Sequence, residues 1–411
     1  MINNTLAILG GQKVKTTPFG TGKRFGAEEA TELLGALEQN TLFYHFGSKV
    51  KKFLADFNDL YNVKYSVATS SGTAALHVAL GAAGVTVGDE VITSPITDQG
   101  TVIGILYQNA IPIFADLEPN SYNMTAEAIE KVISPKTKAI IVVHLAGNPC
   151  DMDSIMELAR KYNVKVIEDC AQSYLTTYKG HLTGTIGDYG CFSTNDFKHI
   201  STGDGGIVTV NSGDEEDYFT THAFADKNYK RHDKEVVKDI LYLAPNYRMT
   251  ELQGAVGIAQ LKKLEWICTR RNELGERLSS GLQNAKGIRP MKITAGGWCS
   301  YWFYMLTLDL DVLSCTREEF SDALTAEGIP NSPGYISQVL YAQSLFQQKQ
   351  AYLNSEYPFS LGDYSYEAGS CPNAEEILKT AIRLDINEFF SDHDIEDMIT
   401  ALNKVAAHYC V

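Results

Sequence analysis

Short apolar runs alternate with amphipathic stretches through the first half of the chain. The apolar runs are rich in Val and Ile, which is typical of buried strands. We expect strands at 65–69, 90–93, 111–114, 139–144 and 164–168. The intervening stretches carry apolar residues at helical spacing, and we expect helices at 74–83, 101–109, 125–133 and 151–162. This alternation predicts an α/β fold whose mostly parallel sheet is flanked by helices.

The flanking parts of the chain follow other patterns. An irregular N-terminal arm precedes helices expected at 27–39 and 50–61, and a long helix is expected at 250–284. The polar segment 213–244 is interpreted, with equal weight, as a mobile segment near the entrance of a binding site or as an ordinary solvated loop. Further on we expect a strand at 302–310 and helices at 317–327 and 392–407. We therefore predict a large domain over 1–255 that includes the arm, and a smaller C-terminal α+β domain over 256–411.

Composition narrows the classes of function. The 411 residues are 44% hydrophobic and 21% charged, as in ordinary globular proteins, and the formal charge is −15. With no Lys/Arg cluster, this charge argues against nucleic-acid and membrane-surface partners. The N-terminus lacks the pattern of a signal peptide, and no apolar run could span a bilayer. The eight cysteines form no CxxC pair, so we expect free thiols, a cytoplasmic location and no metal site.

A lysine near a glycine-rich turn is the first candidate for chemistry. Lys198 is the one lysine between residues 187 and 208, and it precedes the turn 203–206 and a β-branched run at 207–210. A lysine on such a connection can be desolvated, which lowers its pKa and makes its amine a nucleophile toward aldehydes. The alternative is a solvated lysine beside a hairpin, which this stretch alone favours.

Two further features lie where ligands bind to parallel sheets, beyond the carboxyl ends of the strands. Ser71, Gly72 and Thr73 join a strand to a helix and could hold a phosphate, or simply cap the helix. Asp169 and Gln172 follow the strand at 164–168, and Asp169 could be a cap or a fixed anion. Pyridoxal phosphate (PLP) needs a lysine, an anion for its ring nitrogen and a phosphate site. The sequence therefore predicts PLP as cofactor.

Six motifs, in order along the chain, point to one family. They are Ser71 to Leu76, Asp116 to Tyr122, Val166 to Gln172, Ser193 to Gly206, Asn246 to Gln253 and Cys371 to Glu375. On these motifs the chain resembles the DegT/DnrJ/EryC1/StrS family of PLP-dependent sugar and cyclitol aminotransferases, from about residue 6 to residue 407. The resemblance implies the fold-type I architecture of aspartate aminotransferase, with a smaller C-terminal α+β domain.

The resemblance also implies roles for single residues. Lys198 would bind PLP covalently and would move a proton between the substrate's α-carbon and the cofactor. Asp169 would keep the ring nitrogen protonated, and Gln172 would lie near the ring's 3-oxygen.

The phosphate would be held by Gly72, Thr73 and Ser193. Asn246 would reach the phosphate of a neighbouring subunit, which implies a homodimer with shared active sites.

The chain departs from the family pattern at two places. The family usually has an aromatic side chain over the cofactor ring, but the stretch 94–100 has none, so Asp98 or Gln99 is expected to cover that face. Nucleotide-sugar members usually read Ser-Phe-His before the lysine, whereas this chain reads Ser193-Thr194-Asn195. The opening at 9–11 and the stretch 143–147 resemble the branch that aminates keto-cyclitols such as scyllo-inosose.

We expect an aminotransferase that moves an amino group from glutamate or glutamine to a keto-sugar, nucleotide-linked, or to a keto-cyclitol. The two acceptor classes are almost equally favoured, and Lys227, Lys230 and Arg231 are candidates for binding a diphosphate. Alternatives on the same cofactor are a sugar dehydratase or lyase, an aromatic amino-acid-precursor synthase, and a non-catalytic PLP-binding regulator. His144 and His199 are expected to be structural.

Overall fold

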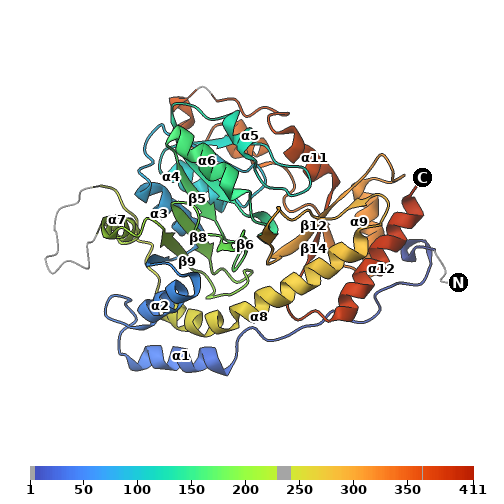
Figure 1. Cartoon of the computed structure of the whole chain (residues 1–411), viewed down its shortest axis with the longest axis horizontal. Coiled ribbons are helices and arrows are strands. Elements are labelled where there is room, and N and C mark those ends of the chain that lie inside the picture. The colour runs from blue at the N-terminus through green and yellow to red at the C-terminus, as the bar shows by residue number, and fades with distance from the viewer. Residues whose placement is uncertain (1–4, 229–241, 363) are drawn as a thin grey trace.

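A seven-stranded sheet lies at the centre of the protein (Figure 1). The computed structural model describes residues 5–228, 242–362 and 364–411, and these include the whole of this sheet. The strand order is β1-β9-β8-β5-β4-β2-β3, and β9 alone runs against its neighbours. Its strands are β1 (Tyr65–Thr69), β2 (Glu90–Thr93), β3 (Ile111–Phe114), β4 (Thr137–Val143), β5 (Lys165–Asp169), β8 (Tyr189–Ser193) and β9 (Gly206–Val210). The mostly parallel α/β fold predicted from the apolar runs is confirmed.

Alternate side chains of these strands enter two different cores. Ile141 and Ile167 pack with α3, α4 and α7, whereas Ile140, Val142 and Val166 pack on the opposite face. Successive side chains of a strand point to opposite faces of the sheet, and helices cover both faces. The strands are therefore apolar at nearly every position. The helices are α1 (Ala27–Glu38), α2 (Lys49–Tyr61), α3 (Gly72–Ala82), α4 (Gly100–Tyr107), α5 (Ala126–Glu130), α6 (Met152–Tyr162), α7 (Glu215–Ala225) and α8 (Glu251–Leu282).

A second sheet follows α8. It has four antiparallel strands in the order β10-β12-β14-β13, namely β10 (Ile288–Arg289), β12 (Phe303–Leu308), β13 (Asn331–Pro333) and β14 (Ala381–Asp385). Its helices are α9 (Arg317–Ala326), α10 (Ser344–Gln347), α11 (Pro372–Thr380) and α12 (Asp392–Tyr409). A small third sheet holds β6 (Thr177–Tyr178), β7 (His181–Leu182) and β11 (Gly297–Trp298). Short 3-10 helices lie at Ala7–Leu9, Leu145–Gly147, Leu340–Ala342 and Phe359–Leu361.

Helix α8 connects the two large sheets. It runs in yellow along one side of the molecule, from α1 and α2 to α9 and α12 (Figure 1). A capping box begins it, in which Thr250 Oγ1 accepts from the N–H of Gln253 and the Gln253 side chain accepts from the N–H of Thr250. The predicted domain division after residue 255 falls inside this helix, and it stays a prediction.

One segment differs from its expected form. The stretch 213–244 was expected to be irregular, but it contains α7, which Asp214 caps by accepting from the N–H of Glu216. Apolar residues lie on all sides of α7, so it has no amphipathic pattern to reveal it. Residues 229–241 lie outside the described part of the chain. Among the described residues, no helix is long and apolar enough to cross a membrane.

Candidate active site

Lys198 lies on the connection between β8 and β9 and lines a cavity of about 240 Å³. Its Nζ atom lies 3.8 Å from the ring centroid of Trp302. Burial lowers the pKa of Lys198 below its usual value, and the nearby carboxylates of Asp169 and Asp98 offset part of this effect. Of the two alternatives that the sequence left open, the structure has the buried lysine, and a lowered pKa makes its amine more nucleophilic at neutral pH.

Asp169 ends β5 and is 5% exposed. Its carboxylate accepts hydrogen bonds from Thr101 Oγ1 at 2.8 Å and from the N–H of Ala171 at 3.1 Å. Burial raises the pKa of Asp169, and these two donors and Lys198 only partly oppose the rise. The carboxylate would therefore be stabilised by a cationic ligand group in the cavity.

The N-terminus of α3 forms one wall of the cavity. Ser71 caps the helix by accepting from the N–H of Ala74, so its hydroxyl serves both the cap and the cavity wall. The N–H groups of Gly72 and Thr73 donate to no acceptor within the described residues. A Cβ on Gly72 would lie 2.6 Å from Ser193 Cβ, so glycine is required for this close approach of α3 to β8. Free N–H groups beside two hydroxyls suit a phosphate.

Gln172 is fixed by two hydrogen bonds at the cavity wall. Its Oε1 accepts from the N–H of Ala146 at 2.8 Å, and its Nε2 donates to the hydroxyl of Tyr335 at 3.3 Å. Tyr335 stacks on Phe303, with 5.0 Å between ring centroids, so the second sheet supplies part of this site. The sequence interpretation missed Tyr335 and Thr101, because neither residue stands in a motif.

The residues predicted to bind PLP line one cavity, with one exception. The cavity is lined by Ser71, Gly72, Thr73, Leu76, Thr97, Asp98, Gly100, Thr101, Asp169, Ala171, Gln172, Ser193, Asn195, Lys198 and Asp204. Of the residues expected to bind PLP, Asn246 is the one that does not line this cavity: it is exposed and forms a β-bridge with Asp226. Its expected reach into a neighbouring subunit stays a prediction. Lys227 does not line the cavity, and Lys230 and Arg231 lie outside the described residues.

The two polar candidates for covering a ring face differ in position. Asp98 lines the cavity, and its Oδ1 accepts from the N–H of Gly100 at 2.8 Å. Gln99 donates instead to Gln343 at 3.1 Å and does not line the cavity. Of the two candidates, only Asp98 lines the cavity among the described residues, and its expected place over the cofactor ring stays a prediction.

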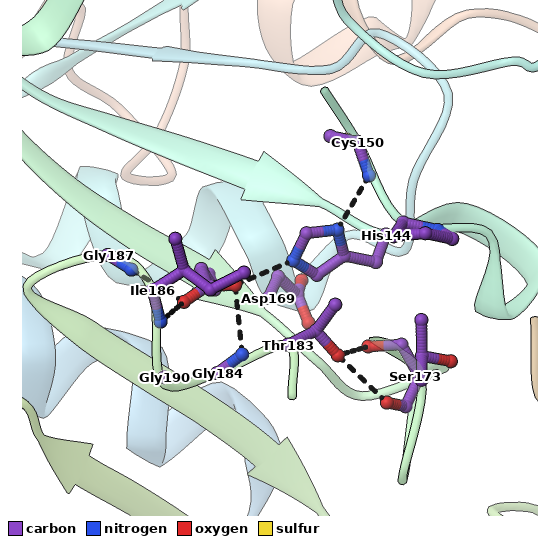
Figure 2. A network of polar contacts seen from close by, with 12 residues as sticks. His144, Cys150, Asp169, Ser173, Thr183, Gly184, Ile186, Gly187 and Gly190 are labelled. Carbon is purple, nitrogen blue, oxygen red and sulfur yellow. Dashed lines mark hydrogen bonds and ion pairs between the residues drawn. The ribbon is translucent and has the colours of Figure 1, made fainter. Parts of the chain in front are cut away.

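His144, Glu168 and Cys170 lie close enough together to hold a metal ion. The eight cysteines form no disulfide, and burial raises the pKa of the Cys170 thiol well above its usual value, which opposes the thiolate that a metal ligand requires. His144 Nδ1 accepts from the N–H of Cys150 at 3.0 Å, so the proton is on Nε2, which donates to Glu168 at 3.0 Å (Figure 2). The same carboxylate accepts three backbone N–H groups, those of Gly184, Ile186 and Gly187. These partners make the cluster a structural support behind Asp169.

His199 is the second histidine expected to be structural. It is buried, its Nε2 donates to the carbonyl of Ser300 at 3.1 Å, and burial lowers its pKa well below the usual value. Its Nδ1 has no hydrogen-bond partner within the described residues. The imidazole ring is therefore neutral, and only one of its two nitrogens has a hydrogen-bond partner among the described residues.

The residues that line the cavity offer the chemical groups that PLP requires. A desolvated amine, a buried carboxylate and a helix N-terminus with free N–H groups are the groups that an aldehyde, a ring cation and a phosphate require. They come from the β8–β9 connection, the end of β5 and the start of α3, and all three line one cavity.

Comparison with known proteins agrees with this site. Residues 24–403 match the DegT/DnrJ/EryC1/StrS aminotransferase family. GDP-perosamine synthase of Escherichia coli is 33% identical over 84% of this chain and 91% of its own length. L-glutamine:2-deoxy-scyllo-inosose aminotransferase of Streptoalloteichus tenebrarius is 29% identical over 98% of both chains.

The fold is also found in solved structures. An aminotransferase from Psychrobacter cryohalolentis superposes with a TM-score of 0.85 at 29% identity, covering 95% of this chain and all of that one. The family model covers the cavity and both large sheets. The chain belongs to the DegT/DnrJ/EryC1/StrS aminotransferase family, whose members are PLP-dependent transaminases.

Proposed function

We propose that this chain transfers an amino group from glutamate or glutamine to a ketone on a polyhydroxylated six-membered ring, a keto-sugar or a keto-cyclitol. The observation that carries the proposal is the meeting of Lys198, Asp169 and the α3 N-terminus in one cavity. When bound, PLP supplies an electron sink that stabilises negative charge at the substrate's α-carbon.

In this proposal each residue acts on a stated atom. The Nζ of Lys198 binds the cofactor, and once released it holds and returns the proton of the substrate carbon. The carboxylate of Asp169 holds the proton on the ring nitrogen, supported by Thr101. The N–H groups of Gly72 and Thr73, with the hydroxyls of Thr73 and Ser193, bind the phosphate.

The polar wall of the cavity supports a hydroxylated acceptor. Asp98, Asn195 and Gln172 present carboxylate and amide groups of the kind that bind sugar hydroxyls. Relatives of similar identity act on a nucleotide-linked sugar and on a cyclitol, as their names state. The acceptor is therefore best identified by offering both classes with glutamate and glutamine as donors.

The first experiment uses Lys198→Ala and the matched Lys161→Ala, whose exposed lysine pairs with Glu130 and does not line the cavity. Wild type and Lys161→Ala should show a visible PLP band that glutamate or glutamine bleaches, and Lys198→Ala should show neither the band nor turnover. Full turnover by Lys198→Ala would refute the proposed mechanism. A band in wild type that no amino acid bleaches would instead favour a dehydratase, a precursor synthase or a regulator.

We also propose a homodimer in which Asn246 completes the partner's phosphate site. Asn246 is exposed and does not line the cavity of its own chain, which supports this arrangement. Subunits carrying Lys198→Ala should be mixed with subunits carrying Asn246→Ala. Each alone should be impaired, whereas a mixed dimer has one intact site and should regain activity. No recovery in verified mixed dimers would contradict the shared site.

A further inference from the structure

The loop that carries Lys198 is held through its backbone carbonyls. Residues 196–199 lie in no helix or strand, yet each of their four carbonyls accepts a hydrogen bond from a distant side chain. The Arg24 guanidinium donates to the carbonyls of Asp196, Lys198 and His199. Trp302 Nε1 donates to the remaining carbonyl, that of Phe197, at 2.7 Å.

Arg24 itself is anchored on α8. Its carbonyl accepts from Gln260 Nε2 at 2.9 Å and from Lys263 Nζ at 3.0 Å. It belongs to the N-terminal arm and does not line the cavity. A guanidinium presents five N–H groups in a rigid plane, so it can serve three carbonyls at once, which a lysine ammonium cannot do with the same geometry.

Trp302 contacts the loop in two ways. Its N–H fixes the carbonyl of the residue before the lysine, while its ring lies 3.8 Å from the lysine Nζ. An ammonium over an indole face is attracted by the ring's quadrupole. The same side chain therefore fixes the backbone at Phe197 and sets where the amine of Lys198 rests.

A buried acid links these two side chains. Glu388 is 3% exposed, lies 3.9 Å from Arg24 Nε and accepts from Arg271 Nε at 2.8 Å. Arg271 in turn donates to the carbonyl of Trp302 at 3.1 Å. Arm, α8 and second sheet thus meet behind the lysine, and Glu388 holds the two arginines together.

We propose that Arg24 and Trp302 are positioning residues that aim the amine of Lys198 at the cofactor. This inference rests on the proposed role of Lys198. The step that they assist is the attack of the Lys198 Nζ lone pair on the PLP aldehyde carbon, which forms a C=N bond and releases water. Since a small misplacement of a reacting atom lowers its rate steeply, a loosened loop slows this step more than it weakens the binding of PLP.

The test measures covalent capture and binding separately. Cofactor-free protein is mixed with PLP, borohydride reduces the C=N bond to a secondary amine at set times, and mass spectrometry quantifies label on the peptide that contains Lys198. The rate at saturating PLP reports capture, and its dependence on PLP concentration reports binding.

The variants are Arg24→Lys and Trp302→Phe, with Arg270→Lys and Trp266→Phe as matched controls. Arg270 also anchors a carbonyl, that of Phe390, but it contacts no residue of the loop. We expect Arg24→Lys and Trp302→Phe to lower the saturated capture rate at least about tenfold while PLP binding changes only about twofold. The controls should match wild type.

Two outcomes separate the proposals. If wild type carries no label at Lys198, the proposed role of Lys198 fails. If wild type is labelled there and Arg24→Lys and Trp302→Phe capture PLP as fast as their controls, the positioning proposal alone is overturned. Should Arg24→Lys fold poorly, Trp302→Phe and added guanidinium on Arg24→Ala decide the question, since guanidinium should restore capture at the emptied position.

Discussion

The Thr101 hydroxyl supports the charge of Asp169, and Thr101→Val removes it without changing the size of the side chain. Thr101 Oγ1 donates to Asp169 Oδ2 at 2.8 Å, and Thr97 Oγ1 lies 2.8 Å from Thr101 Oγ1. A hydrogen bond to a charged group contributes about 1.5–3 kcal/mol. We therefore expect the Kd for PLP to rise by about tenfold or more, since about 1.4 kcal/mol corresponds to a factor of ten.

The loss of PLP affinity in Thr101→Val should depend on pH. The hydrogen bond from Thr101 lowers the pKa of Asp169, which burial has raised, so its loss raises that pKa further. Less of the carboxylate is then ionised near neutral pH, and more becomes ionised as the pH rises. The difference in PLP affinity between wild type and Thr101→Val should therefore shrink with increasing pH.

The assay is a PLP titration of the cofactor-free protein, followed by absorbance at several pH values. Thr101→Ser retains a hydroxyl and serves as the control, so its Kd should stay close to that of wild type. Equal affinity of Thr101→Val and wild type at every pH would refute the reasoning. So would a loss in Thr101→Ser as large as that in Thr101→Val.

Two further predictions concern packing and acid stability. Gly72→Ala places a Cβ 2.6 Å from Ser193 Cβ and should weaken PLP binding by about tenfold in the same titration, whereas Gly26→Ala, where nothing lies within 4 Å, should not. Burial alone would raise the pKa of Asp394, but hydrogen bonds from Lys15 and other donors lower it to about 2. This stabilisation is present above the usual pKa and is lost as the pH falls toward 2, so Asp394→Asn should lower the free energy of unfolding by about 2 kcal/mol at neutral pH and less in acid. Denaturant unfolding of wild type and Asp394→Asn, at neutral pH and in acid, measures this loss of stability. A loss of the same size at both pH values would contradict the lowered pKa of Asp394.

The central sheet could be predicted because its strands carry their own pattern. The run at 111–114 is apolar throughout and became β3 with the same bounds. The helix expected at 250–284 was found as Glu251–Leu282 because a capping box and periodic apolar residues define it locally. By contrast, β6, β7 and β11 have two residues each and exist only through their pairing partners.

The site could be predicted only where its residues stand in motifs. Lys198, Asp169 and Gly72 follow strands or precede a helix, and their surroundings in the sequence indicate chemistry. Tyr335 and Arg24 have no such surroundings, because their partners lie far along the chain. The Arg24–Lys198 contact joins residues 174 positions apart, and no local pattern encodes an interaction of that kind.

Helix α8 limits how the molecule can open and close. Its 32 residues extend about 48 Å at 1.5 Å per residue, and proline is absent from its sequence. Tyr301 fills the space beside Gly275, where an added Cβ would lie 2.5 Å from its ring. A Ser-Gly pair lies near the end of the helix, at 280–281, but an added Cβ on Gly281 would lie 2.5 Å from the side chain of Ile399, so this site is packed as well. A hinge between the two large sheets would have to bend this packed, continuous helix. The sheets are therefore expected to move as one body, which leaves access to the cavity to the loops around it.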